Sequence, residues 1–239
     1  MLHEGHRQRM RERFLSDGLN GFAPHEALEL LLYYAIPKKD VNPLAHTLLE
    51  HFGSLYGVLH ATPAELSQVE GIGAYTSALI GLIAPLSRIA ELSRLGPKPK
   101  LSSRGEAENY CLQLLSGLRH EHFYLLALDL KMQLLGTAII GQGILTETPA
   151  YPRLAVEAAL KFSAHSVILC HNHPGGSPAP SSADLEATAR LAQALAGIDV
   201  TVADHIIVAG GEALSLTQMG YMGHDIQSEP AARAADSSL

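Results

Sequence analysis

The stretch that decides the fold runs from Ser166 to Asp184 and reads SVILCHNHPGGSPAPSSAD. It begins with the apolar run SVILC, whose length fits a short buried β-strand. His171 and His173 follow at the end of this predicted strand, and a Pro-Gly-Gly segment then turns the chain away. Residues two apart in an extended chain point to the same face, so both imidazoles can converge on one point. The stretch therefore predicts a strand with two metal-ligating histidines, His171 and His173, at its C-terminal end.

A carboxylate can complete this candidate metal site. Ser181 begins a predicted helix whose first turn carries Asp184, and a side chain there can point back at the strand end. Two imidazoles and one carboxylate, with a water in the fourth position, form the pattern of a catalytic zinc site rather than a closed structural one. The alternative interpretation of Ser181-x-x-Asp184 is a capping box, in which the two side chains bond only the backbone of their own helix.

The flanking segments alternate between strand and helix patterns, which predicts an α/β (α+β) domain over residues 104–224. The expected strands are Phe123–Leu130, Leu134–Ile140, Ser166–Cys170 and at least one from Ile198–Val202 and Ile206–Ala209. The expected helices are Glu106–Leu115, Pro152–Ala164 and Asp184–Ala196. Residues 225–239 have no apolar period and are expected to form a disordered tail.

The first part of the chain has a different pattern. Apolar residues recur at helical spacing up to about residue 95, which predicts a small all-α domain over residues 1–95. Residues 96–103 contain two prolines and two lysines without an apolar period, and we expect them to form a linker.

Within this domain, residues 66–78 resemble a helix-hairpin-helix with Gly71-Ile72-Gly73 as the hairpin. Glycines there let backbone N–H groups approach a phosphate at a helix start, so weak and non-specific DNA binding is expected. The alternative is a tight turn between two core helices. The next four residues, Ala74 to Ser77, include no Lys or Arg, and this weakens the DNA interpretation.

Charge and composition exclude several classes of protein. The chain has 239 residues, 47% of them hydrophobic, and a formal net charge of −7. Residues 1–100 hold ten basic and ten acidic side chains, whereas residues 101–239 hold seven and fourteen, so neither part provides a basic face in bulk. Only Cys111 and Cys170 are available, which excludes a disulfide-built scaffold and favours a reducing compartment. The sequence shows no signal peptide and no apolar run approaching the ~18 residues that span a bilayer. We expect a cytoplasmic protein without a membrane partner.

The spacing H-x-H-x7-S-x2-D resembles the JAMM (MPN+) metalloprotease motif, and the surrounding HNHPGGSPAPSSAD together with Asp204-His205 resembles the RadC family. The resemblance extends over roughly residues 3–222. It implies that His171, His173 and Asp184 bind Zn²⁺ and that Ser181 hydrogen-bonds the reacting water or the developing oxyanion. Such an enzyme would cleave an amide bond in a peptide or protein substrate.

The chain departs from this motif at one position. JAMM enzymes use an upstream Glu on the second strand as a general base, and threading on the RadC pattern places Ala138 there. Between Phe123 and Cys170 the carboxylates are Asp129, Glu147 and Glu157; Glu147 could swing toward the metal, whereas Glu157 is expected on a solvated helix face.

Two hypotheses follow from these observations. The intact ligand set favours a zinc-dependent hydrolase, while Ala138 favours a binding module that has kept its metal and contacts DNA or a protein. Cys170 is expected to point away from His171 as a small buried hydrophobe. His205 is either a hydrogen-bond partner of a metal ligand or a satisfied core histidine.

Overall fold

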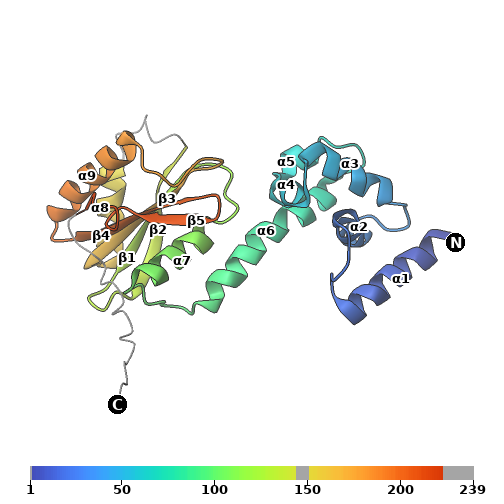
Figure 1. Cartoon of the computed structure of the whole chain (residues 1–239), viewed down its shortest axis with the longest axis horizontal. Coiled ribbons are helices and arrows are strands. Elements are labelled where there is room, and N and C mark those ends of the chain that lie inside the picture. Colours follow the sequence, from blue (N-terminus) through green and yellow to red (C-terminus); the bar gives the residue numbers. More distant parts are fainter. Residues whose placement is uncertain (1, 144–150, 223–239) are drawn as a thin grey trace, which may run out of the picture. The chain divides into compact units, whose positions relative to one another are not determined.

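A computed structural model of the chain describes residues 2–143 and 151–222 (Figure 1). The chain divides into two compact units, Met1–Ser87 and Arg88–Leu239. No helix among the described residues combines the length and apolar character needed to cross a bilayer. The two units are considered separately below.

The first unit is all-helical, as the apolar periodicity predicts. Its helices are α1 (Leu2–Asp17), α2 (Pro24–Ala35), α3 (Asn42–Phe52), α4 (Leu55–His60), α5 (Pro63–Leu66) and α6 (Ala74–Arg94). Thr62 begins α5 with a capping box, because its hydroxyl accepts from the Glu65 backbone while the Glu65 carboxylate accepts from the Thr62 backbone. The core contains fully buried side chains from five of these helices, among them Leu28, Leu32, Leu48, Leu66 and Ile80.

The division between the units differs from the expected domain end at residue 95 and the expected linker at residues 96–103. It falls inside α6, between Ser87 and Arg88. Part of the expected linker is tied to the second unit: Leu101 is buried there and its N–H donates to the Met132 carbonyl at 2.8 Å. The Leu134 N–H donates to the Pro99 carbonyl at 2.9 Å. Prolines and lysines gave this segment the composition of a linker, but one apolar side chain and two backbone hydrogen bonds are enough to order it.

The second unit is an α+β domain, as expected, and consists of a mixed sheet with helices on both faces. Its elements are α7 (Arg104–Leu115), β1 (His122–Leu128), β2 (Leu134–Gln142), α8 (Tyr151–Phe162), β3 (Ser166–Asn172), α9 (Ser182–Ala196), β4 (Thr201–Ala209) and β5 (Glu212–Ser215). The strand order is β2-β1-β3-β4-β5, with β3 and β4 parallel and the other neighbours antiparallel. Helices α8 and α9 cover one face and α7 the other (Figure 1). One strand, β4, replaces the two expected runs at 198–209, and the four-residue β5 was not expected.

Strand β3 is the centre of this sheet and is buried along its whole length. Val167 and Leu169 face the apolar cluster under α8 and α9, while Ile168 and Cys170 face the cluster under α7. Because strand side chains alternate, this pattern sends His171 to the α8 and α9 side and Cys170 to the opposite side. The predicted role of Cys170 as a small buried hydrophobe is confirmed.

Candidate metal centre

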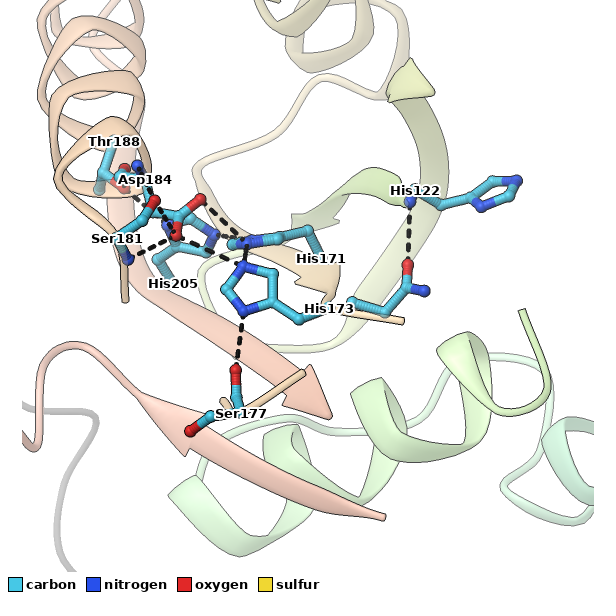
Figure 2. A network of polar contacts seen from close by, with 9 residues as sticks. His122, His171, His173, Ser177, Ser181, Asp184, Thr188 and His205 are labelled. Carbon is cyan, nitrogen blue, oxygen red and sulfur yellow. Dashed lines mark hydrogen bonds and ion pairs between the residues drawn. The ribbon is translucent and has the colours of Figure 1, made fainter. Parts of the chain in front are cut away.

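The structure brings the three predicted ligand residues together at the C-terminal end of β3. The Nε2 atoms of His171 and His173 lie 2.9 Å apart. The Oδ1 atom of Asp184, in the first turn of α9, lies 3.1 Å from His171 Nε2, and its Oδ2 atom lies 3.4 Å from His173 Nε2. Figure 2 shows these side chains pointing toward one another from the strand end and the helix start.

A fourth residue, Glu121, belongs to the same cluster. One ligand atom from each of Glu121, His171, His173 and Asp184 lies within 4.8 Å of every other. Glu121 immediately precedes β1, and β1 pairs with β3 in antiparallel register with Phe123 opposite His171. The Glu121 carbonyl also accepts a hydrogen bond from the Gly143 N–H at 3.0 Å, at the end of β2. The start of β1 thus places a carboxylate beside the end of β3.

This position of Glu121 corrects the prediction that Ala138 has replaced the carboxylate of the site. Ala138 lies in β2 opposite Leu125 and packs against the apolar cluster under α8 and α9. Glu121 lies two residues before Phe123, ahead of the segment in which the sequence pattern placed the candidate bases. Glu147 lies outside the described residues, and Glu157 is exposed on α8 and paired with Arg153 at 2.8 Å, as expected for a solvated helix face.

Ser181 and Asp184 form the capping box that was the alternative interpretation of their spacing. The Asp184 N–H donates to Ser181 Oγ at 3.2 Å, while the Ser181 N–H and Oγ–H both donate to Asp184 Oδ2 at 2.7 Å. The two carboxylate oxygens therefore have separate roles: Oδ2 caps α9 and Oδ1 faces His171. Because the Ser181 hydroxyl donates to Asp184, its role as a donor to substrate stays a prediction.

The chemistry of these atoms fits a small divalent cation. His173 Nδ1 lies 2.8 Å from the Ser177 carbonyl, which can only accept, so Nδ1 carries the proton and Nε2 presents a lone pair. Asp184 Oδ1 is buried and has no hydrogen-bond partner among the described residues. Tetrahedral ligands ~2.0–2.1 Å from zinc lie roughly 3.3 Å from one another, close to the spacings of these atoms. A cation would satisfy both the orphaned oxygen and the imidazole lone pairs.

Burial and neighbouring groups set protonation states that suit metal binding. Burial lowers the pKa of His171, although the nearby Asp184 carboxylate opposes this shift. Burial alone would raise the pKa of Asp184, but contact with His171 and the hydrogen bonds from Ser181 outweigh it and hold the pKa well below its usual range. Neutral imidazole and ionised carboxylate are the forms that bind metals.

Asn172, between the two candidate histidine ligands, holds the segment that carries Glu121. Its side chain is buried and points to the opposite face from His171. The Asn172 Nδ2 group donates to the carbonyls of Leu118 at 3.2 Å and His120 at 3.0 Å. Its Oδ1 atom accepts from the His122 N–H at 2.9 Å. Sequence reasoning did not assign Asn172 a role, because its three partners lie about fifty residues away along the chain.

His205 combines the two roles considered for it. It is fully buried, and its Nε2 atom lies 2.8 Å from His171 Nδ1. Burial lowers the pKa of His205 well below its usual value, so the ring is neutral near pH 7. His205 is therefore both a core histidine and the direct hydrogen-bond partner of a candidate metal ligand.

Residues 66–78 of the first unit form a turn between the short helix α5 and the long helix α6. Gly71 has φ +92°, in the left-handed region that favours glycine, and Ile72 packs into the core. Helix α5 has only four residues, so the likeness to a helix-hairpin-helix is limited to the turn and α6. Tyr75 in the first turn of α6 is 90% exposed. Weak DNA binding by this segment stays a prediction.

Comparison with known proteins agrees with this architecture. Residues 101–221 match a family model described as a RadC-like JAB domain, which defines the class of the second unit. Residues 4–78 match a model described as UPF0758 N-terminal. A UPF0758 protein from Rhodobacter capsulatus is 36% identical over 213 residues, which cover 89% of this chain and 100% of the relative. The chain belongs to the UPF0758 family and carries a RadC-like JAB domain.

Proposed function

We propose that the second unit is a zinc-dependent hydrolase that cleaves an amide bond in a peptide or an isopeptide-like linkage. The observation that carries this proposal is the convergence of Glu121 with His171, His173 and Asp184. Three of these residues match the predicted zinc ligands. The fourth supplies the carboxylate that the JAMM resemblance requires beside them.

In this proposal, each residue has a separate task. His171, His173 and Asp184 would hold the zinc ion, which would supply a water with its pKa lowered to ~7 and a Lewis acid for the substrate carbonyl. Glu121 accepts the proton of the attacking water and returns it to the leaving amine, as a general base and then a general acid. Ser181 rotates its hydroxyl from Asp184 toward the developing oxyanion.

The position of Glu121 favours this function over a non-catalytic binding module. The main argument for a module that keeps its metal only as an anchor was the absence of a general base at Ala138. A carboxylate does lie at the cluster, within 4.8 Å of the other ligand atoms. A ligand anchor has no need of a proton acceptor at that place.

Replacing Glu121 tests the proposal. The full chain is loaded with zinc and screened on peptide and isopeptide amides, and Glu121→Gln is then compared with the wild type. Removal of a general base should lower kcat by ~10²–10⁴-fold, while zinc content stays at the wild-type level. Glu157→Gln on the exposed face of α8 is the matched control and should keep the wild-type rate.

Two outcomes contradict the proposal in different ways. A wild-type rate in Glu121→Gln would show that Glu121 is not the base. A zinc-loaded wild type that cleaves no amide would instead support the binding module.

A further inference from the structure

A buried chain of hydrogen bonds runs from His171 away from the metal cluster. His171 Nδ1 lies 2.8 Å from His205 Nε2, and His205 Nδ1 lies 2.6 Å from Thr188 Oγ1. The Thr188 hydroxyl donates to the Asp184 backbone carbonyl at 2.6 Å. Thr188 is 5% exposed, and both histidines are fully buried. Figure 2 shows His171, His205, Thr188 and Asp184 in this sequence of contacts.

The hydrogen bonds of this network all run in one direction, which the Asp184 carbonyl sets. A carbonyl oxygen only accepts, so the single hydroxyl proton of Thr188 points toward Asp184. The Thr188 oxygen must then accept from His205, which places the His205 proton on Nδ1 and leaves a lone pair on Nε2. That lone pair accepts from His171 Nδ1. His171 is left with its own lone pair on Nε2, which faces His173 and Asp184.

We infer that Thr188 and His205 are positioning residues that fix His171 in the tautomer able to bind the metal. This inference rests on the proposed zinc site and deepens it. A metal-ligating histidine usually donates its second N–H to a carboxylate, a backbone carbonyl or water. His173 follows that rule, because its Nδ1 donates to the Ser177 carbonyl. His171 instead donates to the neutral imidazole of His205. Which nitrogen of His171 carries the proton therefore depends on Thr188, two hydrogen bonds away.

The Phe123 ring fixes the orientation of the His171 and His205 imidazoles independently of which nitrogen carries the proton. Phe123 stacks on His171 with ring centroids 5.2 Å apart and meets His205 edge-on at 5.1 Å. These contacts hold both imidazole planes whichever nitrogen carries the proton. Loss of the Thr188 hydroxyl therefore leaves the rings in place. It removes the acceptor for His205 Nδ1, and a proton moved to His205 Nε2 forces the His171 proton onto the nitrogen that faces the cluster.

Thr188→Val and Thr188→Ser form a matched pair for the test, because valine keeps the shape of threonine and serine keeps its hydroxyl. Zinc affinity of the full chain is measured by competition with a chromophoric chelator. We expect Thr188→Val to bind zinc ~10–100-fold more weakly and Thr188→Ser to bind like the wild type. The ¹⁵N shifts of the His171 ring in zinc-free wild type should show the proton on Nδ1, and in Thr188→Val a shift of the proton toward Nε2.

The outcomes separate this inference from the proposed function. Wild-type zinc affinity in Thr188→Val, or a His171 proton on Nε2 in the zinc-free wild type, would overturn the inference and leave the zinc site standing. A wild type that binds no zinc would overturn the proposed function, and the ring ¹⁵N shifts would still decide the tautomer. The ¹⁵N measurement on the wild type needs no variant to fold.

Discussion

Two buried carboxylates, Glu29 in the first unit and Asp184 in the second, differ in how completely their oxygens are hydrogen-bonded. Glu29 in α2 is 2% exposed and Asp184 in α9 is 1% exposed. Burying a charge is costly unless it is paired and hydrogen-bonded. Glu29 meets this condition within its own unit, and Asp184 meets it for only one of its two oxygens.

The partners of Glu29 come from several helices of the first unit. The Tyr33 hydroxyl donates to Oε1 at 2.5 Å, and the Asn42 amide donates to Oε2 at 2.9 Å. His6 of α1 lies 3.2 Å from Oε1. Glu29 thereby joins α1 and the start of α3 to α2. In Asp184, by contrast, Oδ1 faces imidazole nitrogens and has no donor among the described residues.

The difference shows how to tell a structural carboxylate from a functional one. Buried polar groups in native proteins are hydrogen-bonded almost without exception, so an unsatisfied one needs an explanation. Asp204 belongs with Glu29, since it accepts from the backbones of His205 and Thr217 and from the Ser215 hydroxyl. Asp184 marks a site because its free oxygen is buried beside other electron-pair donors.

The largest expected effect is the loss of zinc from His171→Ala, His173→Ala. We expect one zinc per wild-type chain and none in this double variant, measured by elemental analysis. Added zinc should stabilise the wild type by ~4 kcal/mol at a thousand times its Kd and leave the double variant unchanged in thermal unfolding. Zinc at the wild-type level in a folded double variant would contradict the ligand assignment.

Glu29→Gln should show the opposite behaviour. Loss of a charged, fully hydrogen-bonded carboxylate should lower the free energy of unfolding by about 1–3 kcal/mol, while zinc content stays unchanged. Urea unfolding with and without zinc measures both effects. Glu157→Gln, on an exposed face, is the control and should change stability by less than about 0.5 kcal/mol. If Glu29→Gln loses zinc, the distinction between the two carboxylates fails.

Asn172→Ala should loosen the segment that carries Glu121 without removing zinc. The substitution leaves the His122 N–H and the Leu118 and His120 carbonyls without their side-chain partner. Each such loss costs about 1 kcal/mol. Hydrogen exchange of residues 118–122 should become faster than in the wild type, with exchange in the first unit unchanged. Unchanged exchange in this segment would show that Asn172 does not hold it.

The smallest effect concerns the pH dependence set by Asp204. Burial raises the pKa of Asp204 above its usual value, although hydrogen bonds from Ser215, Thr217 and His205 oppose the shift. As pH rises, the unfolded chain loses this proton first, near pH 3.9. Stability contributed by the protonated form is therefore lost between that pH and the higher folded pKa. Asp204→Asn should flatten this part of the curve of unfolding free energy against pH. An unchanged slope of this curve in Asp204→Asn would contradict the prediction.

The convergence of His171, His173 and Asp184 could be predicted from the sequence because every contribution to it is local. Strand alternation relates His171 to His173, and the helix start relates Ser181 to Asp184. Helix patterns likewise predicted the all-α first unit. Each of these relations spans only a few residues, so a periodicity or a spacing reveals it.

Glu121 and Asn172 could not be found in this way, since their roles depend on contacts about fifty residues apart. Glu121 reaches the cluster only because β1 lies beside β3 in antiparallel register. A search for acids just before the first apolar run would have found Glu121 if that pairing had been assumed. Strand β5 was missed because four residues carry too little alternation.

The hydrogen-bond chain behind His171 has a consequence for the order in which the site assembles. All four cluster residues precede β4 in the chain, so a growing polypeptide presents them before His205 is made. In the proposed site, His171, His173 and Asp184 alone would bind an ion with either histidine tautomer available. If His205 fixes the tautomer of His171 as inferred, full affinity requires β4 to pair with β3 and to place His205 beside His171. Tight zinc binding would then indicate that the β3-α9-β4 crossover has formed. A fragment that ends before β4 should bind the ion more weakly than the whole chain.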